Sequence, residues 1–529
     1  MSRYKTKEAV HNRAKDAIGT PLELIYEQCG QYDANPQSKN YVGDAFEAWM
    51  DVPKNSRAEA DLSEAGVELK ATPYKILKDG RPSAKERLVL NIINYMNEAK
   101  ATFETSSFAN KDKLMELIFY KNDPKNKDKS TWTFDEAILF SFPEKDLEVI
   151  KHDWETIHDM IMQGKAHELS EGMTDYLGAC TKGASSKTLR DQPFSDIKAK
   201  QRAYSLKASY MTSILRNYVF GSQTDPAIQK DKFSTRTMSH SDSKCFSTQE
   251  IATVDELAHK GLDDIIRDKL NAFSGKTVAE LKKIFNINIS KKTKQLNSIL
   301  IARMLGLKGD SANEAEEIQK ADIQVKTISL KKNGKIKEHM SFPAFKFSDI
   351  QNTDFEDSDF YESISKKFLF AVFKRLRNQN PSDDEIVFIG AKCWYLPADD
   401  IKNIELVYND TKSKIQQGVH LKSKINSNNK VTVSNNFIGS SDYSTDGTKY
   451  IAHVRPHARL SQYFEGAYSN ELPVPAVWSG RPDDDEHYDP SGRFIPTQSF
   501  WLNSTYLNEQ IRDVVNAFEK NSSETSIDK

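Results

Sequence analysis

Hydrophobic residues in the first half of the chain follow two different spacings. In Asn40–Met50 they recur at intervals of three and four positions, which predicts an amphipathic helix. In Ala65–Pro73 they alternate with charged residues, which predicts a strand that ends at the proline. Apolar runs at 87–96 and 114–120 predict buried strands, and 147–165 predicts a long helix. Alternating helices and strands favour an α/β domain.

The second half of the chain repeats this pattern. Residues 146–164 and 400–418 share an acidic residue, two isoleucines, an aromatic residue and a glycine, each pair 254 positions apart. Asp61–Thr72 aligns with Glu317–Ile328 at an offset of 256. Further along, "AYSLKASYM" aligns with "SFWLNSTYL". Ordered matches at similar offsets indicate a tandem duplication.

A chain of 529 residues exceeds one typical core, in agreement with a duplication. Residues 223–248 are rich in Ser, Thr, Asp and Lys and predict a linker. We therefore expect one domain at 1–222, a second at 249–518 and a disordered tail at 519–529.

Composition excludes several classes of protein. No apolar run reaches the roughly 20 residues of a membrane helix, and the N-terminus lacks the apolar core of a secretory signal, so we expect a cytoplasmic protein without a membrane partner. The four cysteines are scattered, which argues against a zinc site or a disulfide framework. The net charge of -2 does not favour nucleic acid, so a DNA-binding surface must come from a local cluster.

One such cluster lies at Ile197–Gln223, which contains five basic residues, three interleaved tyrosines and no acidic residue. Basic residues with interleaved aromatics are typical of nucleic-acid binding. A solvated helix or hairpin is the alternative interpretation of the same segment.

The candidate catalytic chemistry is in "DLSEAGVELKATP", residues 61–73. On a strand, Glu68 and Lys70 project from one face while Val67 and Leu69 point into the core. Two carboxylates offer hard oxygen ligands to Mg²⁺, and Asp61 could reach the same ion from a neighbouring turn or strand. By itself the spacing is a hypothesis, because it is expected by chance about once in a chain of this length.

The ordered set of motifs resembles the MutH-like endonucleases. The motifs are Lys39, "VGDAFEAWM", "AGVELKATP", "GRPSAKERL", "FETSSFANK", "DWETIHDMIMQG" and "SLKASYMTSIL". The chain, with its duplication, is most similar to the two-domain, Sau-type restriction enzymes of this family, which cut at GATC. The resemblance implies two tandem restriction-endonuclease-like α/β domains, each a mixed central sheet flanked by helices.

The resemblance also implies roles for the residues of the opening motif. The family's metal-binding acids match Asp61 and Glu68, with the backbone carbonyl of Leu69 as a further Mg²⁺ ligand. Its catalytic lysine matches Lys70, which would orient or deprotonate the attacking water.

Two further active-site residues follow from the same alignment. Glu47 matches a helix glutamate that supports the metals and water, and Lys111 matches a second lysine that approaches the scissile phosphate. A structural ion pair is the alternative for both.

DNA contacts are implied at three places in the first half. Lys39 matches a lysine that reaches bases. The family's recognition loop falls on Tyr176–Lys187, where the MutH repair nuclease has an arginine-proline pair and this chain has Cys180-Thr181. Lys182 is retained and is expected to contact a base or phosphate.

The third place is the basic cluster, within which Arg202, Tyr204 and Lys207 would contact the DNA backbone and set the register.

The second half departs from the family at its catalytic positions. Ala302, Gln324 and Ser363 stand where the first half has Glu47, Glu68 and Lys111. Arg455-Pro456 nevertheless restores the arginine-proline pair, and Trp501 is available for an apolar or stacking contact. We therefore expect a DNA-binding, allosteric domain without catalysis. A degenerate copy kept for packing is the alternative.

These observations predict a Mg²⁺-dependent type II restriction endonuclease that cuts double-stranded DNA at GATC, with a second GATC copy bound by the C-terminal domain as activator. One catalytic centre cuts one strand, so a double-strand break needs either two chains that meet on DNA or two successive nicks, and we expect dimerisation on DNA through the C-terminal domains. The expected functional partner is a DNA methyltransferase that protects GATC. A MutH-like repair nickase and a non-catalytic GATC-binding protein are the alternatives.

Overall fold

The computed structural model describes residues 4–53, 59–182, 188–221, 228–230, 249–288, 295–377, 379–425, 427–428, 430–484 and 486–527. The chain forms two compact units. Unit 1 comprises residues 1–269 and 291–325, and unit 2 comprises residues 270–290 and 326–529. Residues 249–269 and 291–325 pack with the first half, so the units differ from the domain limits predicted at residue 249.

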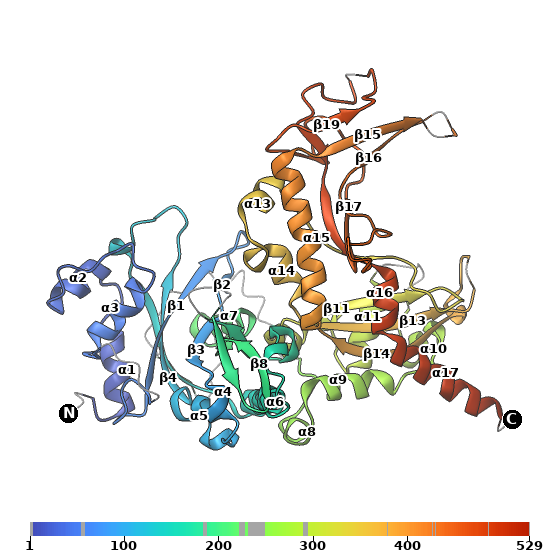
Figure 1. Ribbon diagram of the computed structural model, residues 1–529. Coiled ribbons are helices and arrows are strands. Elements are labelled where there is room, and N and C mark those ends of the chain that lie inside the picture. Colours follow the sequence, from blue (N-terminus) through green and yellow to red (C-terminus); the bar gives the residue numbers. More distant parts are fainter. Residues whose placement is uncertain are drawn as a thin grey trace. The chain divides into compact units, whose positions relative to one another are not determined.

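The main sheet of unit 1 has the strand order β10-β5-β4-β1-β2 (Figure 1). Its strands are β1 (Glu68–Ile76), β2 (Pro82–Ala84), β4 (Leu114–Lys121), β5 (Phe134–Ser141) and β10 (Ile228–Lys230). β1 runs parallel to β4 and antiparallel to β2, so the sheet is mixed. β10 belongs to the predicted linker, and the other residues of 223–248 lie outside the described residues.

Three helices cover one face of this sheet: α1 (Lys7–Lys15), α2 (Leu22–Gln28) and α3 (Tyr41–Trp49) (Figure 1). Their apolar residues share a core with Val67 and Leu69 of β1. This packing confirms the helix predicted over 40–50 and leaves the opposite face of β1 to Glu68 and Lys70.

The remaining elements of unit 1 include a small sheet of order β3-β9-β6 and a hairpin β7-β8. The strands are β3 (Leu88–Ile92), β6 (Leu177–Thr181), β7 (Leu189–Gln192), β8 (Ser195–Lys200) and β9 (Arg202–Leu206). The helices are α4 (Tyr95–Glu98), η1 (Phe103–Thr105), α5 (Ser107–Lys111), η2 (Lys129–Thr131), α6 (Glu144–Met162), η3 (Ala166–Glu168), η4 (Glu171–Met173), α7 (Ala208–Ile214), η5 (Leu215–Val219), α8 (Val254–His259), α11 (Leu296–Met304), η6 (Ala312–Glu314) and α12 (Glu316–Ala321).

The main sheets of unit 2 have the orders β11-β13-β14, β12-β21-β17 and β16-β15-β19, with a short β18-β20 pair. The strands are β11 (Gln324–Leu330), which begins in unit 1, β12 (Met340–Phe345), β13 (Phe368–Arg375), β14 (Ile386–Trp394), β15 (His420–Ile425), β16 (Val431–Asn435), β17 (Ala452–Pro456), β18 (Ser469–Glu471), β19 (Val477–Ser479), β20 (Phe494–Pro496) and β21 (Gln498–Leu502). The helices are α9 (Leu262–Asn271), which begins in unit 1, α10 (Val278–Ile284), α13 (Phe347–Asn352), η7 (Phe355–Asp357), α14 (Asp359–Ile364), η8 (Asp383–Glu385), α15 (Ala398–Gln417), α16 (Ser504–Gln510) and α17 (Arg512–Ile527).

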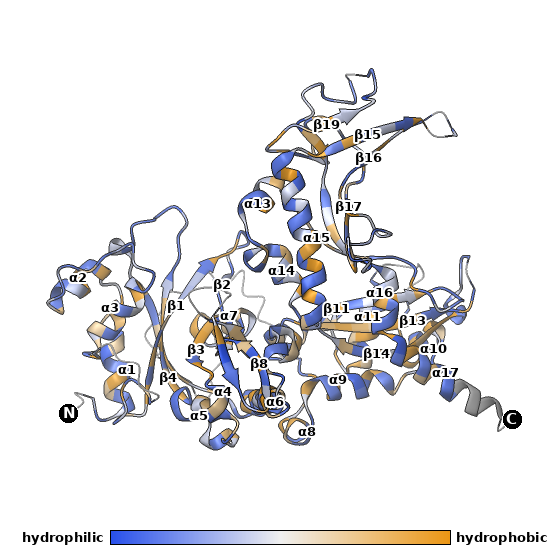
Figure 2. Cartoon of the chain, viewed as in Figure 1, coloured by the Kyte–Doolittle hydropathy of each residue, from blue (hydrophilic) through white to orange (hydrophobic). Residues whose placement is uncertain are grey.

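The two copies of the duplicated sequence repeat the same internal contacts. Tyr210 donates a hydrogen bond to Asp146 Oδ2 at 2.9 Å, and Tyr506 donates one to Asp400 Oδ2 at 2.6 Å. In each case the acid begins a long helix, α6 or α15, that carries both hydrophobic and hydrophilic residues (Figure 2). Equivalent residues thus make equivalent contacts, as a duplication requires.

Two predicted boundaries are wrong. β1 continues through Pro73 to Ile76. The Pro73 carbonyl accepts a hydrogen bond from the Lys85 amide, the residue just after the end of β2. Because β2 has ended there, the N–H that Pro73 lacks costs the sheet no hydrogen bond. The tail expected to be disordered from 519 instead continues α17 as far as Ile527. Val514, Val515 and Phe518 anchor that helix on the unit 2 core, and a helix once anchored extends through polar residues.

No helix in the described part of the chain combines the length and apolar character of a membrane span. Within the described part of the chain, Cys29 and Cys180 are free thiols.

Candidate active site

Strand β1 places Glu68 and Lys70 together, as its alternation predicts. Glu68 is 1% exposed, and its Oε1 lies 2.6 Å from Lys70 Nζ. Val67 and Leu69 point the other way, into the core beneath α1–α3. A buried carboxylate and ammonium therefore share one face of the strand.

Asp61 reaches the same place through a tight turn. Leu62 and Val67 form an antiparallel bridge, closed by Gly66 at a φ of +65°, so the next pair outward is Asp61 and Glu68. The Asp61 amide donates to Glu68 Oε2 at 3.1 Å, and the Leu69 amide donates to Asp61 Oδ2 at 3.3 Å. This geometry explains the spacing of seven residues between the two acids.

Lys111 enters the site from the end of α5. Its Nζ lies 3.4 Å from Glu68 Oε1, so both lysines approach one carboxylate oxygen. In the adjacent strand Met115 of β4 is paired with Glu68, which brings the α5–β4 connection beside the carboxylates. The structure therefore unites Asp61, Lys70 and Lys111 in one cluster around the buried Glu68 carboxylate.

Asp112 belongs to this cluster and was missed by the sequence reasoning. It is fully buried, and neither carboxylate oxygen has a hydrogen-bond partner in the described part of the chain. Burial raises its pKa to about 7, although Lys70 opposes that shift. Its position directly after Lys111 in the sequence was the available signal.

Burial and the neighbouring charges shift the pKa values of the cluster's side chains. Burial raises the pKa of Asp61, and the Glu68 charge adds to that effect. Burial alone would lower the pKa of Lys70, but Glu68 and Asp112 outweigh it and the pKa is raised. The lysine charge is thus stabilised by the surrounding acids.

The donor set fits a hard divalent cation. Two adjacent carboxylates supply hard oxygens, and the Leu69 carbonyl faces the same strand edge as its amide, which bonds Asp61. Elsewhere in the described residues, as here, no group of three or more His, Cys, Asp or Glu side chains surrounds a common metal position. A cation at Asp61 and Glu68 would therefore complete its shell with the carbonyl, water or substrate oxygens.

Glu47 and Lys39 are placed by α3. Glu47 is half-buried on this helix, whose apolar face packs against Val67 and Leu69. Lys39 is exposed just before the helix begins. The exposed position leaves Lys39 accessible to DNA.

The predicted recognition segment begins on β6 and is anchored by a second residue that sequence reasoning missed. Asp153 of α6 accepts the backbone amides of Asp175, Tyr176 and Leu177 at 2.6, 2.6 and 2.8 Å. Its place in the motif "DWETIHDMIMQG" was the available signal. At the other end of β6 Lys182 is exposed, and residues 183–187 lie outside the described residues.

Two residues predicted to contact DNA are core residues instead. The Arg202 guanidinium is buried and donates to the carbonyls of Ala179 and Leu169. Tyr204 is fully buried and donates to Glu98 at 2.9 Å. Their hydrogen bonds stabilise the β3-β9-β6 sheet. Because both side chains are buried, the prediction that they contact DNA directly is wrong.

Lys207 is half-buried and also bonds within unit 1. Its Nζ donates to the carbonyls of Thr174 at 2.6 Å and Ala321 at 3.3 Å. Sequence patterns identify the basic segment but do not distinguish a lysine that holds carbonyls from one that reaches phosphate.

The second copy has lost the carboxylate pair. Glu317, the counterpart of Asp61, is fully buried, accepts the amides of Ile251 and Ala252 at 3.0 Å, and pairs with Lys145 at 2.8 Å. Its charge is therefore used to hold two segments of unit 1 together.

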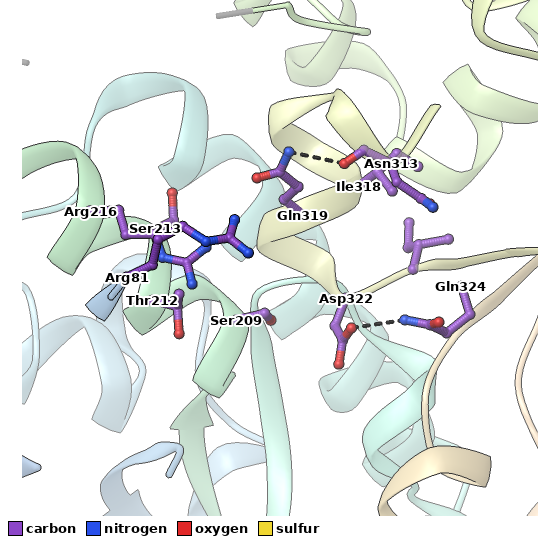
Figure 3. Close-up of a pocket in the computed structure, with 11 residues that line it drawn as sticks. Arg81, Ser209, Thr212, Ser213, Arg216, Asn313, Ile318, Gln319, Asp322 and Gln324 are labelled. Atoms are coloured by element: carbon purple, nitrogen blue, oxygen red, sulfur yellow. Dashed lines mark hydrogen bonds between the residues drawn. The ribbon is translucent and has the colours of Figure 1, made fainter. Parts of the chain in front are cut away.

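Gln324, the counterpart of Glu68, lines a pocket of about 390 Å³ in unit 1 (Figure 3). Its amide donates to Asp322 Oδ1 at 3.0 Å, and Arg81, just before β2, and Arg216 of η5 line the pocket. Burial and the Arg81 charge lower the pKa of Arg216. The pocket holds one carboxylate and two guanidinium groups, which is not the composition of a metal site.

Arg455 of β17 is an exposed guanidinium held in place by its neighbours. Its Cζ lies 3.9 Å from the centre of the Trp501 ring, and Trp501 is 9% exposed. The His457 ring meets Trp501 edge to face at 5.0 Å. Arg455, rather than Trp501, is therefore the group that unit 2 presents to solvent.

Comparisons with known proteins agree with this geometry. A family model described as DNA mismatch repair enzyme MutH matches two segments, residues 50–153 and 305–405, one in each copy of the duplication. A type II restriction enzyme, Sau3AI of Staphylococcus aureus, is 41% identical over 533 residues, which cover 97% of this chain and 100% of that enzyme.

Shorter relatives match only part of the chain. The mismatch repair protein MutH of Vibrio campbellii is 23% identical over 40% of this chain and 94% of its own length. MutH of Shewanella woodyi is 28% identical, with coverage of 40% and 91%.

Proposed function

The chain belongs to the MutH-like type II restriction endonucleases, and we propose that it hydrolyses double-stranded DNA at GATC with Mg²⁺ bound by the first copy. The cluster of Asp61, Glu68, Lys70 and Lys111 carries the proposal. It combines two hard carboxylates with two ammonium groups that converge on Glu68 Oε1 at 2.6 and 3.4 Å.

Each residue has a chemical task in phosphodiester hydrolysis. Asp61, Glu68 and the Leu69 carbonyl would hold Mg²⁺, which supplies Lewis-acid stabilisation of the phosphate charge when bound. Lys70 lies on the same strand face and would orient or deprotonate the attacking water. Lys111 would neutralise a phosphate oxygen, and Glu47 would support the water from α3.

Only the first copy is proposed to cut. Glu317 is occupied by two amides and Lys145, and Gln324 replaces the carboxylate of Glu68. An amide is a poorer ligand for Mg²⁺ than a carboxylate. The second copy would instead bind a further GATC site through Arg455 and activate cleavage, as the arginine stacked on Trp501 is preorganised for guanine.

Digestion of plasmids tests the specificity. We expect fragments whose ends map to GATC, because the motif set matches GATC-cutting members of the family. Unmethylated, adenine-methylated and cytosine-methylated plasmids digested in parallel would show which modification protects a host, and hence which methyltransferase is the functional partner. Ends that map to any other sequence would refute the proposed specificity.

Cutting two strands with one centre per chain requires two chains on DNA or two successive nicks, and we propose that two chains meet on DNA through unit 2. With Arg455→Ala we expect about tenfold weaker binding of a second GATC duplex and loss of its activation, because a bidentate guanine contact is removed. Sedimentation of the wild type with a GATC duplex should show two chains per assembly. Arg459→Ala, an alteration of a nearby arginine, is the control.

One chain per duplex at full cutting activity would exclude dimerisation. Unchanged activation in Arg455→Ala would exclude that residue as a reader.

A further inference from the structure

Asp112 is a buried charge that the proposed mechanism does not use. It is 0% exposed, and neither Oδ atom has a hydrogen-bond partner in the residues that the structure describes. Buried carboxylates in folded proteins are normally paired, because an unpaired one is strongly destabilising. An acid kept in such a position indicates a function that outweighs its cost in stability.

Its location ties it to the catalytic lysines. Asp112 follows Lys111, whose Nζ lies 3.4 Å from Glu68, and precedes β4, which is paired with β1 from Glu68 onward. Burial raises the pKa of Asp112 to about 7, and the nearby charges of Lys70 and Lys111 oppose that shift. Asp112 therefore lies within the field of both ammonium groups.

The present hydrogen bonds leave Glu68 engaged by the lysines. Lys70 and Lys111 both approach Glu68 Oε1, at 2.6 and 3.4 Å. A divalent cation that binds Glu68 Oε1 competes with these ammonium groups for that oxygen. Displaced ammonium groups close to a dication would repel it unless another carboxylate took them.

We propose that Asp112 is a positioning residue that accepts the ammonium groups of Lys70 and Lys111 when a divalent cation occupies Glu68. It thereby keeps both lysines beside the scissile phosphate and lowers their repulsion of the cation. This inference rests on the proposed cation site.

The test is Asp112→Asn, which keeps the shape and removes the charge. Ca²⁺ titrated into the full chain and followed by calorimetry should bind at least about tenfold more weakly, because a nearby negative charge is lost. Single-turnover cleavage with Mg²⁺ should slow to a similar extent. The Tm without metal should rise by a few degrees, because an unpaired buried charge is removed.

Glu116→Gln is the matched control. Glu116 is another fully buried carboxylate on β4, but it is paired with His11 at 3.0 Å on the α1 side of the sheet. Its loss should leave Ca²⁺ affinity unchanged. If Asp112→Asn does not fold, Asp112→Ser gives the same comparison.

The outcomes separate this inference from the function it rests on. Wild-type Ca²⁺ affinity and cleavage in Asp112→Asn would overturn the positioning role, as would a lowered Tm with unchanged affinity or failure of both variants to fold. Cleavage that survives loss of Glu68 would instead overturn the proposed metal site itself.

Discussion

Glu68→Ala should abolish cleavage while leaving DNA binding intact. Glu68 is the buried acid on which Asp61, Lys70 and Lys111 converge, so its loss removes a metal ligand and the partner of both lysines. We expect single-turnover cleavage of a GATC duplex to fall by at least about 10³-fold, equivalent to roughly 4 kcal/mol of transition-state stabilisation. Gel-shift titrations in EDTA should give the wild-type dissociation constant.

Glu64→Ala provides the matched control, because Glu64 is an exposed carboxylate in the same turn. It should cut like the wild type. Rapid cleavage by Glu68→Ala would disprove the assignment of the site, and joint loss of cleavage and binding would point to a folding defect.

Lys320→Met should strongly destabilise unit 1. Lys320 Nζ lies 2.7 and 2.8 Å from the two oxygens of Asp146, and both side chains are about 5% exposed or less. Tyr210 donates to the same carboxylate. Removing the lysine leaves Asp146 charged, buried and short of a partner, which should cost about 3–5 kcal/mol in free energy of unfolding.

Urea unfolding followed by fluorescence measures this loss. Adding Asp146→Asn to Lys320→Met should recover part of the stability, because the uncompensated charge is then gone. Lys260→Met is the control, since Lys260 pairs with Asp268 at a similar 2.8 Å but in solvent, and its loss should have little effect. A double variant no more stable than Lys320→Met would contradict the explanation.

The catalytic strand could be predicted from the sequence because the signals that define this strand are local. Period-two alternation predicts that Glu68 and Lys70 share a face. The resemblance to MutH-like enzymes supplied a role for Asp61 and added Lys111, and the structure brings these two residues to the two oxygens of the Glu68 carboxylate. The residues of the site and their chemistry could therefore be predicted without knowledge of the fold.

Burial that depends on elements distant in the sequence could not be predicted in the same way. Arg202 and Tyr204 stand in a basic, aromatic segment, yet β9 lies in the middle of its sheet and turns both side chains inward. Asp112 and Asp153 look like ordinary polar residues until the strands and helices that surround them are assembled. Pro73 ended the predicted strand because nothing local reveals that β2 stops opposite it.

The tyrosine–acid contact shared by the two copies has a consequence for how this chain has diverged. Tyr210 of α7 with Asp146 of α6, and Tyr506 of α16 with Asp400 of α15, join equivalent pairs of helices, and β6 and β17 pair with β9 and β21 in matching register. Cys180 and Arg455 therefore occupy equivalent positions in the two copies of the fold. The side chain at this position can therefore be exchanged, by evolution or by engineering, without a change in the strands and helices that hold it. Such an exchange would alter which DNA bases are recognised.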